Sequence, residues 1–309
     1  MPRFTSRTLV ALAFTLVVWA SAFAGIRAGL HAYSPANLAI LRFLVASLVL
    51  AIYAGIAHFR RPELRDIPGL VLTGAIGITF YNLALNHGET RVTAGAASLL
   101  IASTPIWTAL AARFWLHEKL TATGWSGVLV SFAGVALIAS GEGEGIRLSP
   151  QALIILAAAV TSALYMILQK HYLGRYSALE FTAYSIWFGT ALMLPFGNGL
   201  MHTLRDAPAS ATLAVIYLGI FPGALAYVAW AYVLSHGAAG RTSTLLYVIP
   251  VLAIGIGWLW LGEVPRLLTF AGGAVALAGV IMVNLRGRTE TLSTPASESV
   301  KPDELQASA

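Results

Sequence analysis

The chain repeats part of its own sequence at a fixed offset of 145 residues. Four landmark residues of the first half recur in the second half with the same spacing. They are Pro105, Glu118, Gly127 and Gly134, which correspond to Pro250, Glu263, Gly272 and Gly279. A chain made of two copies of one unit folds as two related halves, and the relative orientation of the halves decides what the protein can do.

The composition indicates that both copies lie in lipid. Hydrophobic residues make up 58% of the chain and charged residues 10%, against about a quarter charged in an ordinary soluble domain. Mean hydropathy is +0.76, so the surroundings are predicted to be largely hydrocarbon. The absence of cysteine excludes disulfides and thiolate chemistry. Although the net charge is +6, the basic residues fall in short segments between apolar runs, and nucleic-acid binding is not predicted.

Apolar runs long enough to cross a bilayer, about 17 to 25 residues, occur ten times. The predicted spans are residues 8–26, 36–57, 67–85, 92–115, 122–140, 152–168, 178–196, 209–233, 242–261 and 267–283. Residues 1–143 form the first predicted repeat and residues 144–287 the second, each with five spans. Residues 288–309 are polar and are predicted to be a disordered cytoplasmic tail.

The distribution of Lys and Arg predicts the orientation. With a cytoplasmic N-terminus, twelve of these residues fall in cytoplasmic segments and four in outer segments, so both termini are predicted to be cytoplasmic. Because each copy has an odd number of spans, the second copy is inverted relative to the first. The predicted fold is therefore all-α and integral to the membrane, with ten transmembrane helices as two inverted five-helix repeats around a central cavity. Such a pair of halves can open alternately to each side, and transport is the first hypothesis.

Several short motifs resemble a known family. The strings are Pro35-Ala36-Asn37, Leu41-Arg42-Phe43-Leu44, Thr104-Pro105 to His117-Glu118, and Pro250 to Gly262-Glu263 with Gly272 and Gly279. With the ten spans they resemble the EamA family of the drug/metabolite transporter superfamily, over about residues 8 to 285, and are similar to its YddG-type aromatic amino-acid exporters. One departure is His117, where the second copy has Gly262.

The resemblance implies a basket of ten helices in a bacterial inner (plasma) membrane that exports aromatic amino acids and related small metabolites. A broader-specificity drug/metabolite exporter, or an exporter of other small solutes with the same fold, is the alternative.

An aromatic amino acid offers a flat apolar ring and a zwitterionic head, so its site needs ring surfaces beside a few polar groups. The mid-span candidates are Trp19, Ser21, Tyr81, Asn82, Ser103, Trp107, Tyr165, Tyr227, Trp230 and Tyr247. An unpaired amide in hydrocarbon costs about 2 to 7 kcal/mol, so Asn82 must face a neighbour or a wet cavity. The alternative for Asn82 is a hydrogen bond between helices. For the aromatic residues it is an interfacial belt or ordinary packing.

Charged and helix-breaking residues add three further candidates. Arg42 lies about 9 Å into its span and is predicted to anchor a substrate carboxylate, with snorkelling or structural pairing as the alternative. Pro105 and Pro250 lie inside their spans, where proline interrupts a helix. We expect the interrupted helices to line the path and gate it, the alternative being kinks that only shape packing. Glu263 and its counterpart Glu118 are expected to tie helix ends to loops.

The sequence lacks the motifs that are typical of enzymes and of metal-binding proteins. No H-E-x-x-H or G-x-S-x-G sequence is present, so an enzyme is not predicted. The histidines near span ends lack metal-ligand spacing, and neither a metal nor a cofactor is predicted. A structural or sensory protein, and a cleaved signal peptide over residues 1–24, are further alternatives.

All acidic residues lie in loops, in the tail or at span ends. Transport is therefore predicted to follow the substrate gradient, unless a water-filled cavity uses a glutamate at a span end. The predicted partners are a small-molecule substrate and membrane lipid. Glycine pairs at positions 25 and 29 and at positions 219 and 223 permit close helix packing within one chain or between two, so the protein is predicted to be a monomer or a weak homodimer.

Overall fold

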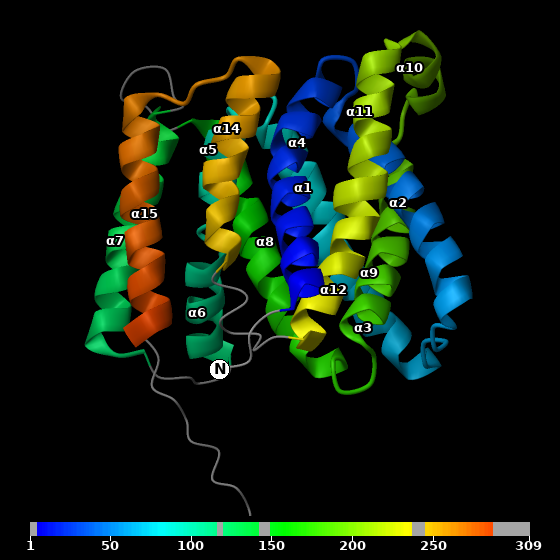
Figure 1. Ribbon diagram of the computed structural model, residues 1–309, viewed down its shortest axis with the longest axis horizontal. Coiled ribbons are helices and arrows are strands. Elements are labelled where there is room, and N and C mark those ends of the chain that lie inside the picture. Colours follow the sequence, from blue (N-terminus) through cyan, green and yellow to red (C-terminus); the bar gives the residue numbers. More distant parts are fainter. Residues whose placement is uncertain (1–4, 116–119, 142–148, 237–244, 287–309) are drawn as a thin grey trace, which may run out of the picture.

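The computed structural model describes residues 5–115, 120–141, 149–236 and 245–286, which form a bundle of helices (Figure 1). The helices of the first half are α1 (Ser6–Leu30), α2 (Pro35–Ala57), η1 (Leu64–Asp66), α3 (Ile67–Gly74), η2 (Ala75–Phe80), α4 (Tyr81–Gly88), α5 (Ala94–Ile101), α6 (Thr104–Trp115) and α7 (Ala122–Gly141). The helices of the second half are α8 (Pro150–Tyr172), α9 (Ala178–Met193), η3 (Leu194–Phe196), α10 (Leu200–Asp206), α11 (Ala209–Ile220), η4 (Phe221–Leu225), α12 (Ala226–His236), η5 (Leu245–Val248), α14 (Ile249–Leu261) and α15 (Leu267–Arg286).

Hydroxyl side chains begin several of these helices. Ser34 and Ser149 cap α2 and α8, and in both helices a proline follows directly, where its missing N–H costs nothing. Ser177 and Glu180 form a capping box at the start of α9. These polar residues therefore fix where α2, α8 and α9 begin.

Each of the ten predicted spans coincides with helical structure in the described residues. Seven helical segments are long and apolar enough to cross a membrane: Ser6–Leu30, Pro35–Ala57, Leu64–Gly88, Ala94–Ala111, Ala122–Gly141, Pro150–Tyr172 and Ala209–Val233. Leu245–Leu261 and Leu267–Val283 are apolar but shorter, and α9 with η3 occupies the remaining range. Helix α10 was not predicted because its seven residues are too few to appear as a span. Glu118 and the polar tail 288–309 lie outside the described residues.

Helices of the first half pack mainly against helices of the second. Helix α1 contacts α11, α12 and α14, while α8 contacts α4 and α6, and α9 contacts α2 and α3. The largest buried cluster accordingly joins residues of both halves, among them Phe23 and Leu38 with Val215 and Leu218. The two copies are thus interleaved over one core.

Helices α7 and α15 lie side by side with their backbones in close approach (Figure 1). A Cβ atom on Gly127 would lie 2.8 Å from the carbonyl oxygen of Gly279, and one on Gly279 would lie 2.5 Å from that of Gly127. Gly134 and Gly272 meet in the same way, at 2.6 and 2.7 Å. Because the residue order reverses from one helix to the other, the two helices are antiparallel. Only residues without a side chain permit this distance.

Glycines also join helices within the chain elsewhere. A Cβ on Gly25 would press on Leu218, and one on Gly219 would lie 2.6 Å from the carbonyl oxygen of Arg42. The paired glycines at positions 25 and 29 and at positions 219 and 223 therefore bring α11 against α1 and α2. These glycines thus pack helices within one chain.

Two helices contain a π-helical segment at corresponding positions of the halves. Segment η2 (Ala75–Phe80) interrupts α3 and α4, and η4 (Phe221–Leu225) interrupts α11 and α12. Shifted by the repeat offset of 145 residues, η4 falls on residues 76–80. A π-helical turn shifts the register of the helix and frees backbone groups, and such turns are frequent at functional sites. The sequence analysis did not predict these segments.

The two predicted proline breaks are present. Helix α5 ends at Ile101 and α6 begins at Thr104, so Pro105 is the second residue of α6. Pro250 is likewise the second residue of α14, after the 3₁₀ turn η5. A proline in the first turn sacrifices no helical hydrogen bond. The helices are thus interrupted just before Pro105 and Pro250. The role of these interruptions in lining or gating a path stays a prediction.

The contact between α7 and α15 leads to a stability prediction. Gly134→Ala places a methyl group against the backbone of α15, and we expect a loss of about 1 to 3 kcal/mol through overpacking. The matched control is Gly255→Ala in α14, where nothing lies within 4 Å of the added Cβ. Thermal unfolding of the two variants in detergent measures the difference. Equal unfolding temperatures for both variants would show that the close contact is absent.

Candidate functional site

Three of the predicted rings meet between α1 and α12. The ring centroid of Trp19 lies 5.4 Å from that of Tyr227 and 5.6 Å from that of Trp230. The indole Nε1 of Trp19 donates a hydrogen bond of 3.3 Å to the carbonyl oxygen of Pro222, which lies in the π-helical segment η4. The irregular backbone thus positions the indole, and the three rings form an apolar surface contributed by both halves.

Arg42 is buried inside the bundle, with 8% of its surface exposed. Its Nη1 donates a hydrogen bond of 3.4 Å to Oδ1 of Asn82, and Nδ2 of Asn82 donates at 2.8 Å to the carbonyl oxygen of Ile78 in η2. The Nε of Arg42 has no hydrogen-bond partner within the described part of the chain. Arg42 therefore pairs with Asn82 instead of snorkelling to the surface, and it retains a free donor.

The ring group and the Arg42–Asn82 pair belong to one region. Arg42 interacts electrostatically with both Tyr81 and Tyr227, and Tyr227 also contacts Trp19. Asn82 and Tyr227 are themselves 145 residues apart and so hold the same position in the two copies. Each is the second residue after a π-helical segment. Six predicted residues are thus brought together, and we call them the central group: Trp19, Arg42, Tyr81, Asn82, Tyr227 and Trp230.

Two further candidates contact neighbouring helices around this group. The hydroxyl groups of Ser21 and Tyr217 share a hydrogen bond of 2.6 Å between α1 and α11. The ring of Tyr165 on α8 lies 5.5 Å from that of Phe181 and covers Gly77 of η2, where any Cβ would overlap it. Tyr165 also lies near Tyr227. Ser21 thus makes a hydrogen bond between two helices.

The remaining candidates gather around α6 and α7. Trp107 Nε1 donates a hydrogen bond of 3.3 Å to Ser103 Oγ, and the Trp107 ring lies 5.0 Å from that of Phe132. Tyr247 packs against the adjoining cluster that contains Ile106 and Val128. Ser103, Trp107 and Tyr247 therefore form a second aromatic group, next to the helix break at Pro105.

Glu263 ties helix ends together, as expected for it. Gly262 ends α14 in the left-handed region, with φ +68°, which favours glycine. The carboxylate of Glu263 then accepts hydrogen bonds from Arg27 Nε at 2.7 Å and from the backbone N–H of Ala94 at 3.0 Å. A residue of the second half thus joins the end of α1 to the start of α5. A carboxylate is favourable at that place, because the backbone N–H groups at a helix N-terminus carry partial positive charge.

A residue that the sequence analysis did not single out lies beside this tie. Glu89 follows α4 and is fully buried, and neither carboxylate oxygen has a hydrogen-bond partner within residues 5–115, 120–141, 149–236 and 245–286. Arg27 Nη1 donates a hydrogen bond of 2.6 Å to the backbone carbonyl oxygen of Glu89. Because Glu89 follows the end of an apolar run, the sequence indicates an exposed acidic residue in a loop.

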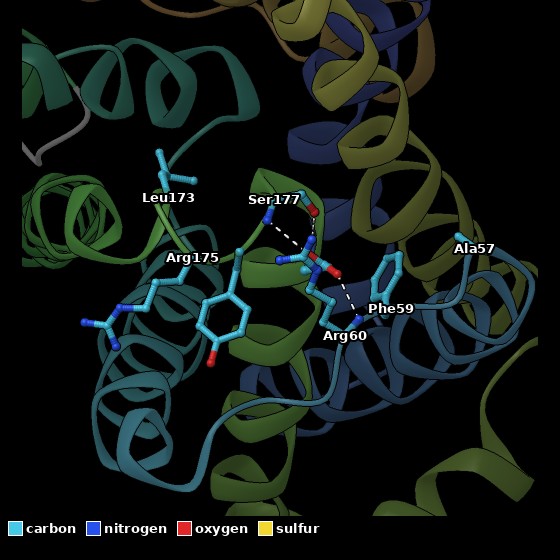
Figure 2. Close-up of a pocket in the computed structure, with 9 residues that line it drawn as sticks. Ala57, Phe59, Arg60, Leu173, Arg175 and Ser177 are labelled. Carbon is cyan, nitrogen blue, oxygen red and sulfur yellow. Dashed lines mark hydrogen bonds between the residues drawn. The ribbon is translucent and has the colours of Figure 1, made fainter.

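A pocket of about 480 Å³ lies where the α2–α3 and α8–α9 connections meet. Figure 2 shows Ser177 beside Arg60 at its centre, with Phe59 on one side and Leu173 and Arg175 on the other. No residue of the central group lines this pocket. It is therefore a feature of the loop end of the bundle, separate from the predicted mid-span site.

Polar contacts hold the two connections of this pocket together. The Arg60 N–H donates to Glu180 Oε1 at 2.9 Å, and Tyr176 donates to Asp66 Oδ2 at 2.8 Å. Arg175 pairs with the same Asp66 carboxylate. Its hydrogen bond to Asp66 raises the pKa of Arg175, and burial raises the pKa of Tyr176. Both groups are protonated at neutral pH even at their ordinary pKa values, so each can donate to the Asp66 carboxylate there.

Metal binding finds no support in the described ranges, where no three His, Cys, Asp or Glu side chains gather in a way that could hold an ion. The donors of the central group are instead a guanidinium, an amide and phenol hydroxyls. Such groups bind organic ions and polar small molecules.

Comparison with known proteins identifies related chains. The EamA-like transporter family matches this chain twice, over residues 7–140 and 149–285. The uncharacterized transporter YdfC of Bacillus subtilis (strain 168) is 41% identical over 286 residues, which are 93% of this chain and 94% of YdfC. A probable terminal-alkyne amino-acid exporter of Streptantibioticus cattleyicolor is 41% identical over 292 residues, 94% of this chain and 98% of the exporter. One crystal structure of another protein superposes with a TM-score of 0.59 at 21% identity, covering 91% of this chain and 97% of that one, which shows a likeness of fold alone.

The Glu263 tie leads to a second stability prediction. Glu263→Gln removes a charged hydrogen bond whose side chains are only 22% and 16% exposed, and we expect a loss of about 1.5 to 3 kcal/mol. Glu63→Gln is the matched control, because its pair with Arg65 is 53% and 70% exposed and should contribute under about 1 kcal/mol. Thermal unfolding in detergent compares the two, and a smaller loss for Glu263→Gln than for Glu63→Gln would contradict the assignment.

Proposed function

The chain belongs to the EamA-like transporter family, and from this premise we propose that it exports amino acids with apolar side chains, aromatic ones among them. It is a multi-pass membrane transporter and not an enzyme. Its relative from Streptantibioticus cattleyicolor is named as an amino-acid exporter, which supports this substrate class.

The single observation that carries the proposal is the makeup of the central group. A buried guanidinium with an unpaired Nε lies with an amide beside three aromatic rings. A zwitterionic amino acid presents a carboxylate for the guanidinium and an apolar side chain for the rings. Arg42 is the proposed carboxylate anchor, Asn82 orients it, and Trp19, Tyr227 and Trp230 receive the side chain.

The other candidates take supporting roles in this proposal. Ser21, Tyr81 and Tyr165 surround the central group, while Ser103, Trp107 and Tyr247 line a second part of the path. Pro105 and Pro250 set the helix breaks that let these parts move. In inverted-repeat transporters, interrupted helices at corresponding positions commonly line the substrate site.

Export by alternating access requires two halves of opposite orientation, and we propose that residues 1–143 and 144–287 are these halves, with ten spans in all and residues 288–309 as a cytoplasmic tail. The double match to one family supports the duplication. The glycine contact supports the inversion: Gly127 corresponds to Gly272 in the repeat but meets Gly279 in space. A twofold axis between two antiparallel helices produces this pattern, in which each glycine contacts the counterpart of the other glycine on its own helix.

The membrane and the orientation complete the proposal. We place the protein in the bacterial inner membrane with both termini in the cytoplasm, because the basic residues concentrate in the segments that this orientation puts inside. It acts as a monomer or a weak homodimer, since the glycine pairs described above pack within one chain.

A counterflow experiment tests the function. Proteoliposomes containing the purified chain are loaded with one unlabelled amino acid, and uptake of the labelled form is followed for phenylalanine, tryptophan, tyrosine, leucine and propargylglycine, which carries an alkyne. We expect accelerated uptake of the aromatic and alkynyl amino acids. Acceleration only by non-amino-acid solutes would favour the broader exporter, and no acceleration by any amino acid would overturn the proposal.

The carboxylate anchor can be tested in the same assay. Arg42→Gln removes a charged hydrogen bond worth about 1.5 to 3 kcal/mol, so we expect the apparent KM to rise about 10- to 100-fold. Arg65→Gln, at an exposed pair far less buried than Arg42, is the matched control and should transport normally. An unchanged KM in Arg42→Gln would remove Arg42 from the site.

A further inference from the structure

Glu89 differs from every other acidic residue in the described part of the chain. Asp66, Glu63, Glu180, Asp206 and Glu263 each form an ion pair or accept a hydrogen bond through the carboxylate. Glu89 is 0% exposed, and both of its carboxylate oxygens lack a hydrogen-bond partner among the described residues. A buried carboxylate without a partner is strongly disfavoured in its charged form.

Burial raises the pKa of the Glu89 carboxyl well above its usual range. The neighbouring Glu263 acts in the same direction, whereas Arg27 and Arg42 oppose it. Raised pKa means that the group binds a proton more tightly than a carboxyl in water. Burial therefore favours the protonated, neutral form in this arrangement of the helices.

Neither cation near Glu89 donates a hydrogen bond to its carboxylate. Arg27 donates from Nε and Nη2 to Glu263 and from Nη1 to the backbone carbonyl of Glu89. Arg42 donates to Asn82. Tyr81 is the other titratable group that interacts with Glu89, and a phenol supplies no positive charge at neutral pH. Ionised Glu89 therefore has no cationic hydrogen-bond donor among these residues.

Glu89 also lies within electrostatic reach of Arg42, the proposed carboxylate anchor. A zwitterion bound at Arg42 brings its own ammonium group into the same region. That ammonium is the missing cation, because it donates charge-assisted hydrogen bonds to a carboxylate. The guanidinium and the carboxyl thus complement the two ends of a zwitterionic head.

We propose that Glu89 holds a proton in the empty transporter and exchanges it for the ammonium group of the substrate. The O–H bond of the carboxyl breaks, the proton passes to water, and the ammonium N–H groups donate to the carboxylate in its place. One proton then crosses the membrane opposite to each zwitterion. This inference rests on the proposed function, and it replaces the sequence-based expectation of transport driven by the substrate gradient alone.

Proton movement in the unaltered protein is the first test. Proteoliposomes of the full chain enclose a pH-sensitive dye, and phenylalanine or propargylglycine is added outside without an imposed pH difference. Substrate entry should expel protons and raise the internal pH, with a proton-to-substrate ratio near one. Amino-acid uptake without any pH change would overturn the inference and leave the proposed function standing.

The pH dependence of KM assigns the proton to Glu89. Because one proton competes with one substrate, the apparent KM of the unaltered protein should rise about tenfold per pH unit below the carboxyl pKa. Glu89→Gln should show a KM independent of pH. Glu63→Gln, the same change at an exposed glutamate, should retain the full dependence.

The variant Glu89→Asp controls for the possibility that Glu89→Gln acts only by disturbing the structure. It keeps a carboxyl, so its KM should remain pH-dependent and its proton movement should persist. If Glu89→Gln retains the pH dependence of KM, Glu89 is not the proton site. If none of the variants nor the unaltered protein transports an amino acid, the proposed function itself fails.

Discussion

The contact between α7 and α15 is the interaction on which the rest of this structure depends. In lipid, helices gain little from hiding apolar surface, so close backbone packing has to hold them together. Gly127, Gly134, Gly272 and Gly279 provide this packing in reciprocal pairs. The pairing joins the last helix of each copy in opposite directions.

The same symmetry appears where the helices are irregular. The π-helical segments η2 and η4 hold corresponding positions in the copies, and Asn82 and Tyr227 follow them. The backbone carbonyls of both segments accept side-chain hydrogen bonds, Ile78 from Asn82 and Pro222 from Trp19. Register shifts in two helices thus bring polar and aromatic groups of both halves to one place.

The sequence predicts the helical ranges well, because bilayer thickness sets their length and polar caps set their ends. It also predicts the breaks at Pro105 and Pro250, since proline acts through its own ring. Among the candidate residues, the members of the central group converge, whereas Ser103, Trp107 and Tyr247 gather elsewhere. The sequence analysis does not place η2 and η4, because a π turn leaves the apolar pattern of a span unchanged. Glu89 was missed for a similar reason: its position at a span end indicates a loop, and only packing shows it to be buried.

Inverted orientation of the copies is the central claim, and labelling of corresponding positions tests it most directly. Arg60 and Arg205 are 145 residues apart, both are exposed, and the chain has no native cysteine. Arg60→Cys and Arg205→Cys can therefore be treated separately, in intact cells, with a thiol reagent that cannot cross the membrane. The account predicts labelling of Arg205→Cys from outside and of Arg60→Cys only after permeabilisation. Labelling of both from the same side would contradict it.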